Sequence, residues 1–228
     1  MGIKANIINK TALFITAVLM FLNLYLIFIW APNEINLGIS QRIFYIHIPL
    51  AWLGMISMFI LGITSIIYLF TNNTKWDNLA KSTAEIGVLF LSLLLLTGIV
   101  WSKPTWGIWW TWDAKLTTTL ILWFIYVGYL ALRAYGPPGS QGARYGAILA
   151  LLGIIDTPLI YFATIWWRTH HPELNIGPAA ESTNTIDMAI LQVLMFSLIT
   201  FTFLYIFLLI EKYKLTQIET KTKEIINA

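Results

Sequence analysis

Residues 106–117 read W-G-I-W-W-T-W-D-A-K-L-T and lie between two long apolar segments. Four tryptophans fall within the first seven positions, with Gly107 among them and Asp113 directly after them. Tryptophan has a large apolar face and a single N–H donor, so it collects where a membrane meets water. That position explains part of the cluster but not its density. We therefore interpret the four indoles as a shelf for a flat, apolar ligand.

The segments on either side of this shelf belong to a chain that is too apolar for a soluble domain. Of its 228 residues, 58% are hydrophobic and 11% are charged, and the mean hydropathy is +0.73. Apolar runs of roughly 18 residues or more can cross a bilayer. Six can be drawn, at about 12–30, 46–70, 83–101, 116–134, 145–166 and 188–210. The chain is predicted to be an all-α membrane protein, one polytopic domain over residues 1–228, with its first segment retained as a signal anchor.

The basic residues predict the orientation of these six segments. If both termini are cytoplasmic, ten of the 14 Lys and Arg residues lie inside and four outside, as the positive-inside rule requires. The inner set is Lys4, Lys10, Lys75, Lys81, Arg133, Arg144, Lys212, Lys214, Lys221 and Lys223, and the outer set is Arg42, Lys103, Lys115 and Arg168. We therefore expect outer connections at 31–45, 102–115 and 167–187 and a cytoplasmic tail at 212–228. The net charge of +3 then reflects topology, and no nucleic-acid-binding motif is present.

The histidines and most tryptophans gather at the predicted outer face. His47, His170 and His171 lie at or beside the outer connections, as do eight of the 11 tryptophans, and the inner loops carry only Trp76. Ordinary aromatic belts would populate both interfaces, so this distribution indicates a function on the outer face. The chain has no G-x-x-x-x-G-K-[ST] loop and no cysteine, which argues against ATP hydrolysis by that route and against thiol chemistry. We expect a binding protein and not an enzyme.

The histidines suggest what the shelf holds. A lone histidine near a helix end is usually structural, but these three lie at one membrane depth on different segments, and the chain has no others. Two neutral imidazoles approaching from opposite sides are a ligand set for six-coordinate haem iron. We therefore predict a haem held by His47 and by either His170 or His171, between which the spacing does not decide.

A haem at this depth brings two propionates, which call for cations. Arg42 and Lys115 are the predicted partners, with Arg168 and Lys103 as further candidates. The alternative is that these side chains extend toward the interface or pair with nearby acidic residues. Asp113 is also expected to cap the helix that begins after it.

Two acidic residues lie within the predicted spans. A carboxylate at the centre of a membrane helix is costly, so Asp156 should be paired, protonated or turned into the bundle interior. Pro158 should kink the same helix, and Asp156, helped by Thr157 and Thr164, is expected to satisfy the freed backbone groups. Glu85 is expected to meet Lys81, one helical turn earlier.

These residues carry a close family resemblance. Residues 106–117 resemble the tryptophan-rich signature of the WWD-domain family, the haem-handling membrane proteins of cytochrome c maturation. With six spans, F-Y-I-H-I-P-L-A-W around His47 and I-W-W-R-T-H-H-P around His171, the chain is similar to the CcmC branch. The resemblance covers about Gln41 to Glu211, and the chain is too short for the larger relatives that attach haem.

The resemblance implies a role in haem export and transfer. Such a protein binds haem b non-covalently at the outer face and delivers it to the periplasmic haem chaperone CcmE. The implied company is an ABC transporter of CcmA and CcmB, the small membrane protein CcmD and membrane lipid. The implied location is a bacterial inner membrane, or the inner membrane of an organelle.

By matching residues, the resemblance assigns the axial ligands to His47 and His171. The family places its second histidine four positions after the second Trp of a W-W pair, and His170 falls where an apolar residue is usual. The implied haem platform consists of Trp106, Gly107, Trp109, Trp110, Trp112 and Asp113. Lys115 stands where arginine is common and lacks its bidentate geometry.

Two other functions fit parts of the sequence. A bis-histidine cytochrome subunit for electron transfer across the membrane usually stacks two haems and needs histidines at two depths, whereas these three lie at one. A solute permease would favour internal repeats and helices broken near the midplane. Only residues 156–158 resemble such a break, and no second half matches them.

Overall fold

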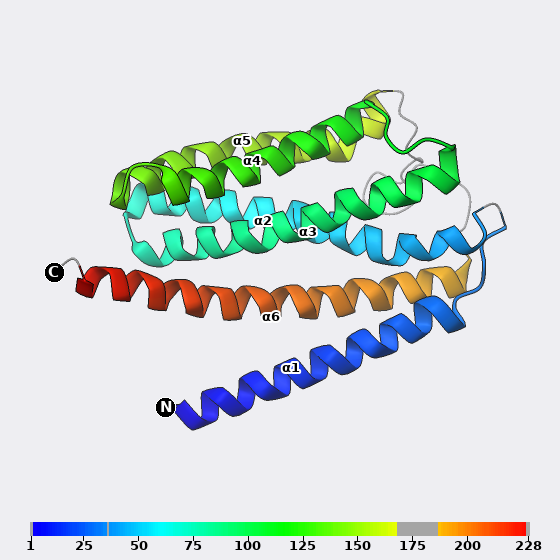
Figure 1. Cartoon of the computed structure of the whole chain (residues 1–228), viewed down its shortest axis with the longest axis horizontal. Helices are drawn as coiled ribbons and strands as arrows, with labels where there is room; N and C mark the ends of the chain where they lie inside the picture. The colour runs from blue at the N-terminus through cyan, green and yellow to red at the C-terminus, as the bar shows by residue number, and fades with distance from the viewer. Residues whose placement is uncertain (1, 36, 168–186, 227–228) are drawn as a thin grey trace.

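The computed structural model describes residues 2–35, 37–167 and 187–226 (Figure 1). Its helices are α1 Gly2–Tyr25, α2 Phe44–Thr71, α3 Thr74–Trp106, α4 Ala114–Tyr135, α5 Gly139–Trp166 and α6 Met188–Ile226. A π-helical turn, η1 (Leu26–Trp30), continues α1, and a 3-10 turn, η2 (Ile39–Ile43), leads into α2. Within the described ranges the only β pairing is an isolated bridge between Glu34 and Gly38. The predicted all-α fold is confirmed.

Each predicted span corresponds to a helix that is long and apolar enough to cross a membrane. Several helices are longer than the apolar runs: α3 covers Thr74–Trp106 where 83–101 was predicted. The added first turns of α3 are polar, and Asn73 caps them by accepting the backbone N–H of Lys75 at 3.0 Å. Hydropathy detects the part of a helix that lies in hydrocarbon, not the turns beyond it.

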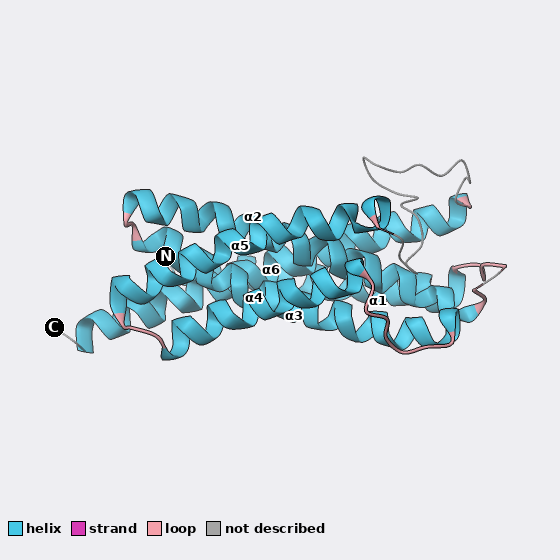
Figure 2. Ribbon diagram, turned by 90° about the horizontal axis from the view of Figure 1, so that it is seen from above, coloured by secondary structure: helices cyan, strands magenta, loops and turns pink. Residues whose placement is uncertain are grey.

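Helices α2, α3, α4 and α5 form a bundle in which α2 packs against α3 and α5, and α4 packs against the same two helices. Helix α6 packs along α2 and α3, and α1 contacts α6 at the edge of the molecule (Figures 1 and 2). Both termini lie at one end, with the α2–α3 and α4–α5 connections. We call the opposite end, with residues 31–43 and 101–115, the tryptophan end.

Small residues allow the helices of this bundle to approach closely, as is common in membrane proteins. Tyr126 of α4 is fully buried, and its hydroxyl donates to the carbonyl of Gly54 on α2 at 2.9 Å. A Cβ on Gly87 of α3 would lie 2.6 Å from the Tyr126 ring, and one on Gly62 would lie 1.9 Å from Ile154. Larger residues at these glycines would therefore push the helices apart.

The C-terminal part of α6 packs against the start of α3. Thr216 is buried and accepts a hydrogen bond from the Ser82 hydroxyl at 3.0 Å. The hydroxyl of Thr220 donates to the side-chain oxygen of Asn78 at 2.9 Å. Residues 212–226, predicted as a tail, are thus a continuation of α6, while their cytoplasmic location remains a prediction.

Ion pairs join α3 and α6 at the same end. Lys81 lies 4.0 Å from Glu85, which confirms the predicted pair. Lys212 of α6 is the closer partner of Glu85, at 2.5 Å, and Lys81 also pairs with Glu219 at 3.1 Å. The local pair predicted from spacing is therefore one part of a network between two helices.

Asp156 is 7% exposed in α5, so its predicted orientation into the protein is confirmed. Within the described ranges its Oδ2 has no hydrogen-bond partner. Helix α5 continues through Pro158, and the Thr157 hydroxyl donates to the carbonyl of Gly153 at 2.8 Å. The carbonyl that Pro158 deprives of a donor is that of Ile154, so this bond does not compensate the proline. The Thr164 hydroxyl is buried and has no partner in the described ranges.

Candidate functional site

His47, in the first turn of α2, lies at the tryptophan end and is only 9% exposed. Its Nδ1 is 3.1 Å from the hydroxyl oxygen of Thr97 on α3. Its ring meets Trp101 edge-on, with ring centroids 5.6 Å apart and planes at 62°. A Cβ on Gly98 would lie 3.2 Å from the ring atom Cε1. Positions 97, 98 and 101 of α3 thus surround this imidazole.

Three neighbours of His47 lie on one face of α3, because position 101 follows position 97 by four residues and position 98 by three. Trp101, the last of them, is 9% exposed and also meets Phe44 of α2, with centroids 6.1 Å apart. The predicted platform began at Trp106 and did not include Trp101. The sequence did not indicate that Trp101 faces His47, because it does not show how α3 is rotated about its axis.

The tryptophan-rich connection runs from residue 107 to residue 113, between α3 and α4. Gly107 and Lys103 form the turn at which it begins. Gly107 ends α3 with a φ of +77°, a left-handed conformation that glycine adopts without steric cost. Its N–H donates to the carbonyl of Lys103 at 3.0 Å, and the Lys103 ammonium donates to the Gly107 carbonyl at 2.7 Å. The same ammonium lies 5.9 Å from the ring centroid of Trp109. Lys103 therefore stabilises this turn.

The connection ends at Asp113, which caps the N-terminus of α4 as predicted. Its Oδ1 accepts the backbone N–H of Leu116 at 3.0 Å. Its Oδ2 accepts the hydroxyl of Thr111 at 3.0 Å. Both carboxylate oxygens are thus used to join the loop to α4.

Between Gly107 and Asp113 the indoles are exposed to different degrees. Trp109 is 57% and Trp112 76% exposed, whereas Trp110 is partly buried. The rings of Trp110 and Trp112 have centroids 5.7 Å apart and planes at 78°. These two rings do not form one flat surface, so a planar ligand can stack on one of them and meet the edge of the other.

Polar groups at this end are left without partners in the part of the chain that the structure describes. The indole N–H groups of Trp101 and Trp110 are buried and have no acceptor there. The ammonium of Lys115 is partly buried and is attracted by the carboxylate of Asp113. Buried donors normally have a partner. An anionic ligand such as a haem propionate fits this set of donors.

Arg42, the other predicted propionate partner, is used within the fold. Its guanidinium donates to the carbonyl of Phe28 in η1 and lies 3.4 Å from the side-chain oxygen of Asn33. The π-helical turn leaves carbonyls near the end of α1 without the usual helical donor. Arg42 therefore joins the end of α1 to the start of α2.

The second predicted ligand, His171, lies outside the described residues, as do His170 and Arg168. Trp166 and Trp167 at the end of α5 are about half-exposed, and Phe162 stacks on Trp166 with centroids 5.1 Å apart and planes at 17°. His47 is the only histidine in the described ranges, where no group of three or more His, Asp and Glu could hold a metal ion. A metal site built by these residues alone is not present there.

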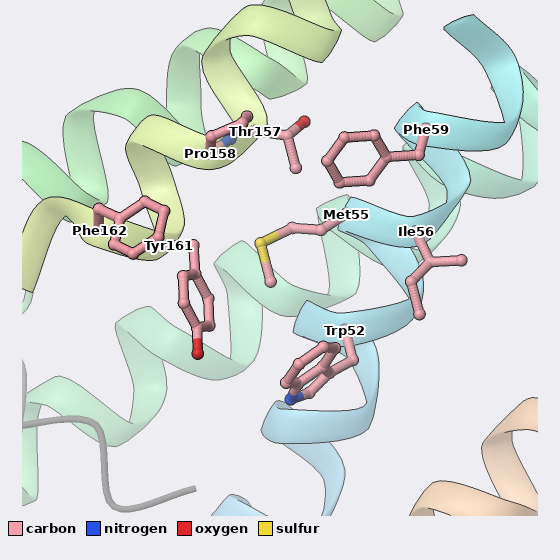
Figure 3. Close-up of a pocket in the computed structure, with 8 residues that line it drawn as sticks. All are labelled: Trp52, Met55, Ile56, Phe59, Thr157, Pro158, Tyr161 and Phe162. Atoms are coloured by element: carbon pink, nitrogen blue, oxygen red, sulfur yellow. The ribbon is translucent and has the colours of Figure 1, made fainter. Parts of the chain in front are cut away.

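A groove lies between α2 and α5 (Figure 3). This groove has a volume of about 290 Å³. Its lining consists of Trp52, Met55, Ile56, Phe59, Thr157, Pro158, Tyr161 and Phe162. Its lining includes no histidine and no charged residue, whereas His47 lies at the tryptophan end.

Comparisons with known proteins give consistent matches over most of the chain. A family model described as Heme exporter protein C matches residues 3–227. The Heme exporter protein C of Bradyrhizobium diazoefficiens is 38% identical over 192 residues, which are 84% of this chain and 72% of that protein. That of Haemophilus influenzae is 35% identical over 215 residues, 92% of this chain and 85% of that protein. A ccmC-like mitochondrial protein of Marchantia polymorpha is 35% identical over 193 residues, 85% of this chain and 80% of that protein.

Proposed function

Because this chain belongs to the Heme exporter protein C family, we propose that it holds haem at the tryptophan end and presents it there to a partner protein. The family gives it a role in haem export for cytochrome c biogenesis, with haem as the transported ligand. The six apolar helices make it a multi-pass membrane protein. The observation that carries the proposal is the buried His47, held by α3 beside the tryptophan-rich connection.

The tryptophan end is placed on the outer face of a bacterial inner membrane, or of an organellar inner membrane. The support is the charge distribution, since ten of the 14 basic residues belong to the end that carries both termini. The exposed indoles of Trp109 and Trp112 then lie where a water-soluble partner can reach a bound ligand.

The iron of haem b is bound non-covalently by two imidazoles, those of His47 and His171. Neutral imidazole is a common axial ligand of haem iron. The platform is formed by Trp106, Gly107, Trp109, Trp110, Trp112 and Asp113. Its indoles contact the macrocycle, and Asp113 holds their loop on α4. Trp109 or Trp112 supplies the stacking face, because these two indoles are the most exposed of the set.

The propionates are met by Lys115 and by the indole N–H groups of Trp101 and Trp110. Lys115 is the first candidate, because both carboxylate oxygens of its acidic neighbour Asp113 already accept hydrogen bonds from Thr111 and Leu116. Arg42 is the second, since its guanidinium already binds the Phe28 carbonyl. A cation and two N–H donors in a partly desolvated site suit a carboxylate.

This chain's residues bind and orient haem and break no bond in it. The vinyl edge of the macrocycle is offered to the periplasmic chaperone CcmE. Two axial imidazoles and stacked indoles hold haem firmly, so release needs work from outside. The ABC transporter CcmA–CcmB supplies that work, and the small membrane protein CcmD completes the complex.

The test is haem binding by the purified full-length chain and its variants. We expect one haem per chain in the wild type and loss of the haem absorbance in His47→Ala with His171→Ala. His170→Ala is the matched control and should keep the spectrum. Equal loss in the His170 variant would contradict the ligand assignment. Two redox-active haems per chain would support an electron-transfer cytochrome subunit instead, and a wild type without haem would favour a permease.

A further inference from the structure

Thr97 lies in α3 at the point where that helix faces His47, and its hydroxyl touches three groups. The oxygen is 2.8 Å from the carbonyl of Leu93 and 3.0 Å from that of Leu94, both in its own helix. It is also 3.1 Å from Nδ1 of His47, fifty residues earlier in the chain. A single side chain thus joins the α3 backbone to the imidazole.

The Thr97 hydroxyl has a single hydrogen, and this decides which atom donates in its hydrogen bond with Nδ1 of His47. A threonine hydroxyl has one hydrogen and two lone pairs. When the hydrogen is given to a backbone carbonyl of α3, the contact with His47 requires the hydroxyl to accept, and Nδ1 must carry the proton. In neutral imidazole the lone pair is then on Nε2, which is the form that binds a metal through Nε2.

The reverse arrangement would prevent ligation through Nε2. If the hydroxyl donated to Nδ1, the ring proton would be on Nε2, and no lone pair would remain there for iron. The first arrangement lets the threonine hydrogen, its lone pair and the Nδ1 proton all take part in hydrogen bonds. The reverse arrangement leaves one hydrogen for two acceptors, the Leu93 carbonyl and Nδ1, so the first arrangement is favoured.

The orientation of the ring is restricted by the same face of α3. Trp101 meets the imidazole edge-on, with ring centroids 5.6 Å apart. A side chain at position 98 would crowd the ring, because its Cβ would lie 3.2 Å from Cε1 of His47. Thr97 is β-branched, and its bond to the Leu93 carbonyl restricts its own rotamer. The acceptor for Nδ1 is therefore held in place before any ligand binds.

We propose that Thr97 is a positioning residue for haem ligation: its hydroxyl accepts the Nδ1 proton of His47 and so prepares Nε2 as the axial ligand. This inference rests on the proposed function. A hydrogen bond from the distal ring nitrogen increases the electron density of a ligating imidazole, and losing it typically weakens metal binding about 10–100-fold. A more basic imidazole stabilises ferric iron more than ferrous iron, so loss of the bond should raise the reduction midpoint.

The experiment compares three variants of the full-length chain in detergent micelles. Thr97→Val keeps the shape and removes the hydroxyl, Thr97→Ser keeps the hydroxyl, and Thr64→Val is the matched control. Thr64 is buried in α2 and donates to the carbonyls of Ile60 and Leu61 at 2.7 and 3.0 Å, the same pattern without a histidine. Affinity for ferric haem, the absorption spectrum and the haem midpoint potential are measured for each.

We expect Thr97→Val to bind ferric haem about 10–100-fold more weakly and to have a higher midpoint potential than the wild type. Thr97→Ser and Thr64→Val should match the wild type in both. A Thr97→Val protein with unchanged affinity and midpoint would overturn the inference, as would a Thr97→Ser protein that behaves like Thr97→Val. If Thr97→Val does not accumulate, Thr97→Ala removes the same acceptor with a smaller side chain and has the same expected outcome. Absence of haem from the wild type would refute the proposed function itself, which keeps the two failures distinct.

Discussion

Replacing Asp113 separates a structural role at the tryptophan end from a direct role toward haem. Its two carboxylate oxygens accept from the Leu116 N–H and from the Thr111 hydroxyl, each at 3.0 Å. Asp113→Asn keeps an oxygen for the Leu116 N–H, and its amide can donate to the Thr111 oxygen. Asp113→Ala removes both bonds. The asparagine variant therefore preserves the connection between the loop and α4 while removing the charge.

The magnitude follows from these two bonds. Replacing an N-terminal cap by alanine costs about 1 kcal/mol, and a hydrogen bond to a charged group contributes about 1.5–3 kcal/mol. Asp113 is partly exposed, so the lower part of this range applies. We expect Asp113→Ala to lower the free energy of unfolding by about 2–3 kcal/mol, and Asp113→Asn by less than about 1 kcal/mol.

The assay is equilibrium unfolding in mixed micelles, followed by tryptophan fluorescence, together with a haem titration of each folded variant. Asp187→Ala is the control, because Asp187 accepts the Ala189 N–H at 2.7 Å at the start of α6 and is not part of the tryptophan-rich connection. It should lose about 1 kcal/mol and keep its haem affinity. Asp113→Asn should also keep its affinity, whereas Asp113→Ala should bind haem about tenfold more weakly, equivalent to 1.4 kcal/mol.

The decisive comparison is between the two Asp113 variants. If Asp113→Asn loses haem as fully as Asp113→Ala while its unfolding free energy stays near that of the wild type, the carboxylate charge acts on the ligand directly. The assignment of Asp113 to holding the loop on α4 would then be wrong.

Two further predictions concern the bundle itself. Gly87→Ala should lower the unfolding free energy by about 1–3 kcal/mol, because its Cβ would lie 2.6 Å from the buried Tyr126 ring. Gly128→Ala is the control, since the nearest atom to a Cβ there is 3.4 Å away. Equal effects of the two substitutions would contradict this reasoning. Asp77→Asn should cost about 3 kcal/mol, because Asp77 pairs with Arg133 at 2.7 Å and both side chains are largely buried. Glu211→Gln breaks the half-exposed pair with Lys214 and should cost at most about 1 kcal/mol in the same unfolding assay; a similar cost for both would show that burial does not set the difference.

The sequence predicted the features that depend on neighbours along the chain. The six helices follow from apolar runs, because in hydrocarbon each backbone N–H and carbonyl must be bonded within its own segment. The Asp113 cap and the Lys81–Glu85 pair are also local, each fixed by a spacing of a few residues. The family was indicated by the tryptophan-rich run, whose density has no structural explanation in an ordinary membrane interface.

Contacts between segments could not be predicted in the same way. Thr97 reaches His47 across fifty positions, Arg42 binds the carbonyl of Phe28, and α6 continues past the apolar run to pack on α3. Each depends on how a helix is rotated about its axis. In a membrane span almost every face is apolar, so hydrophobic periodicity indicates that rotation poorly, and the packing of one helix on the next decides it.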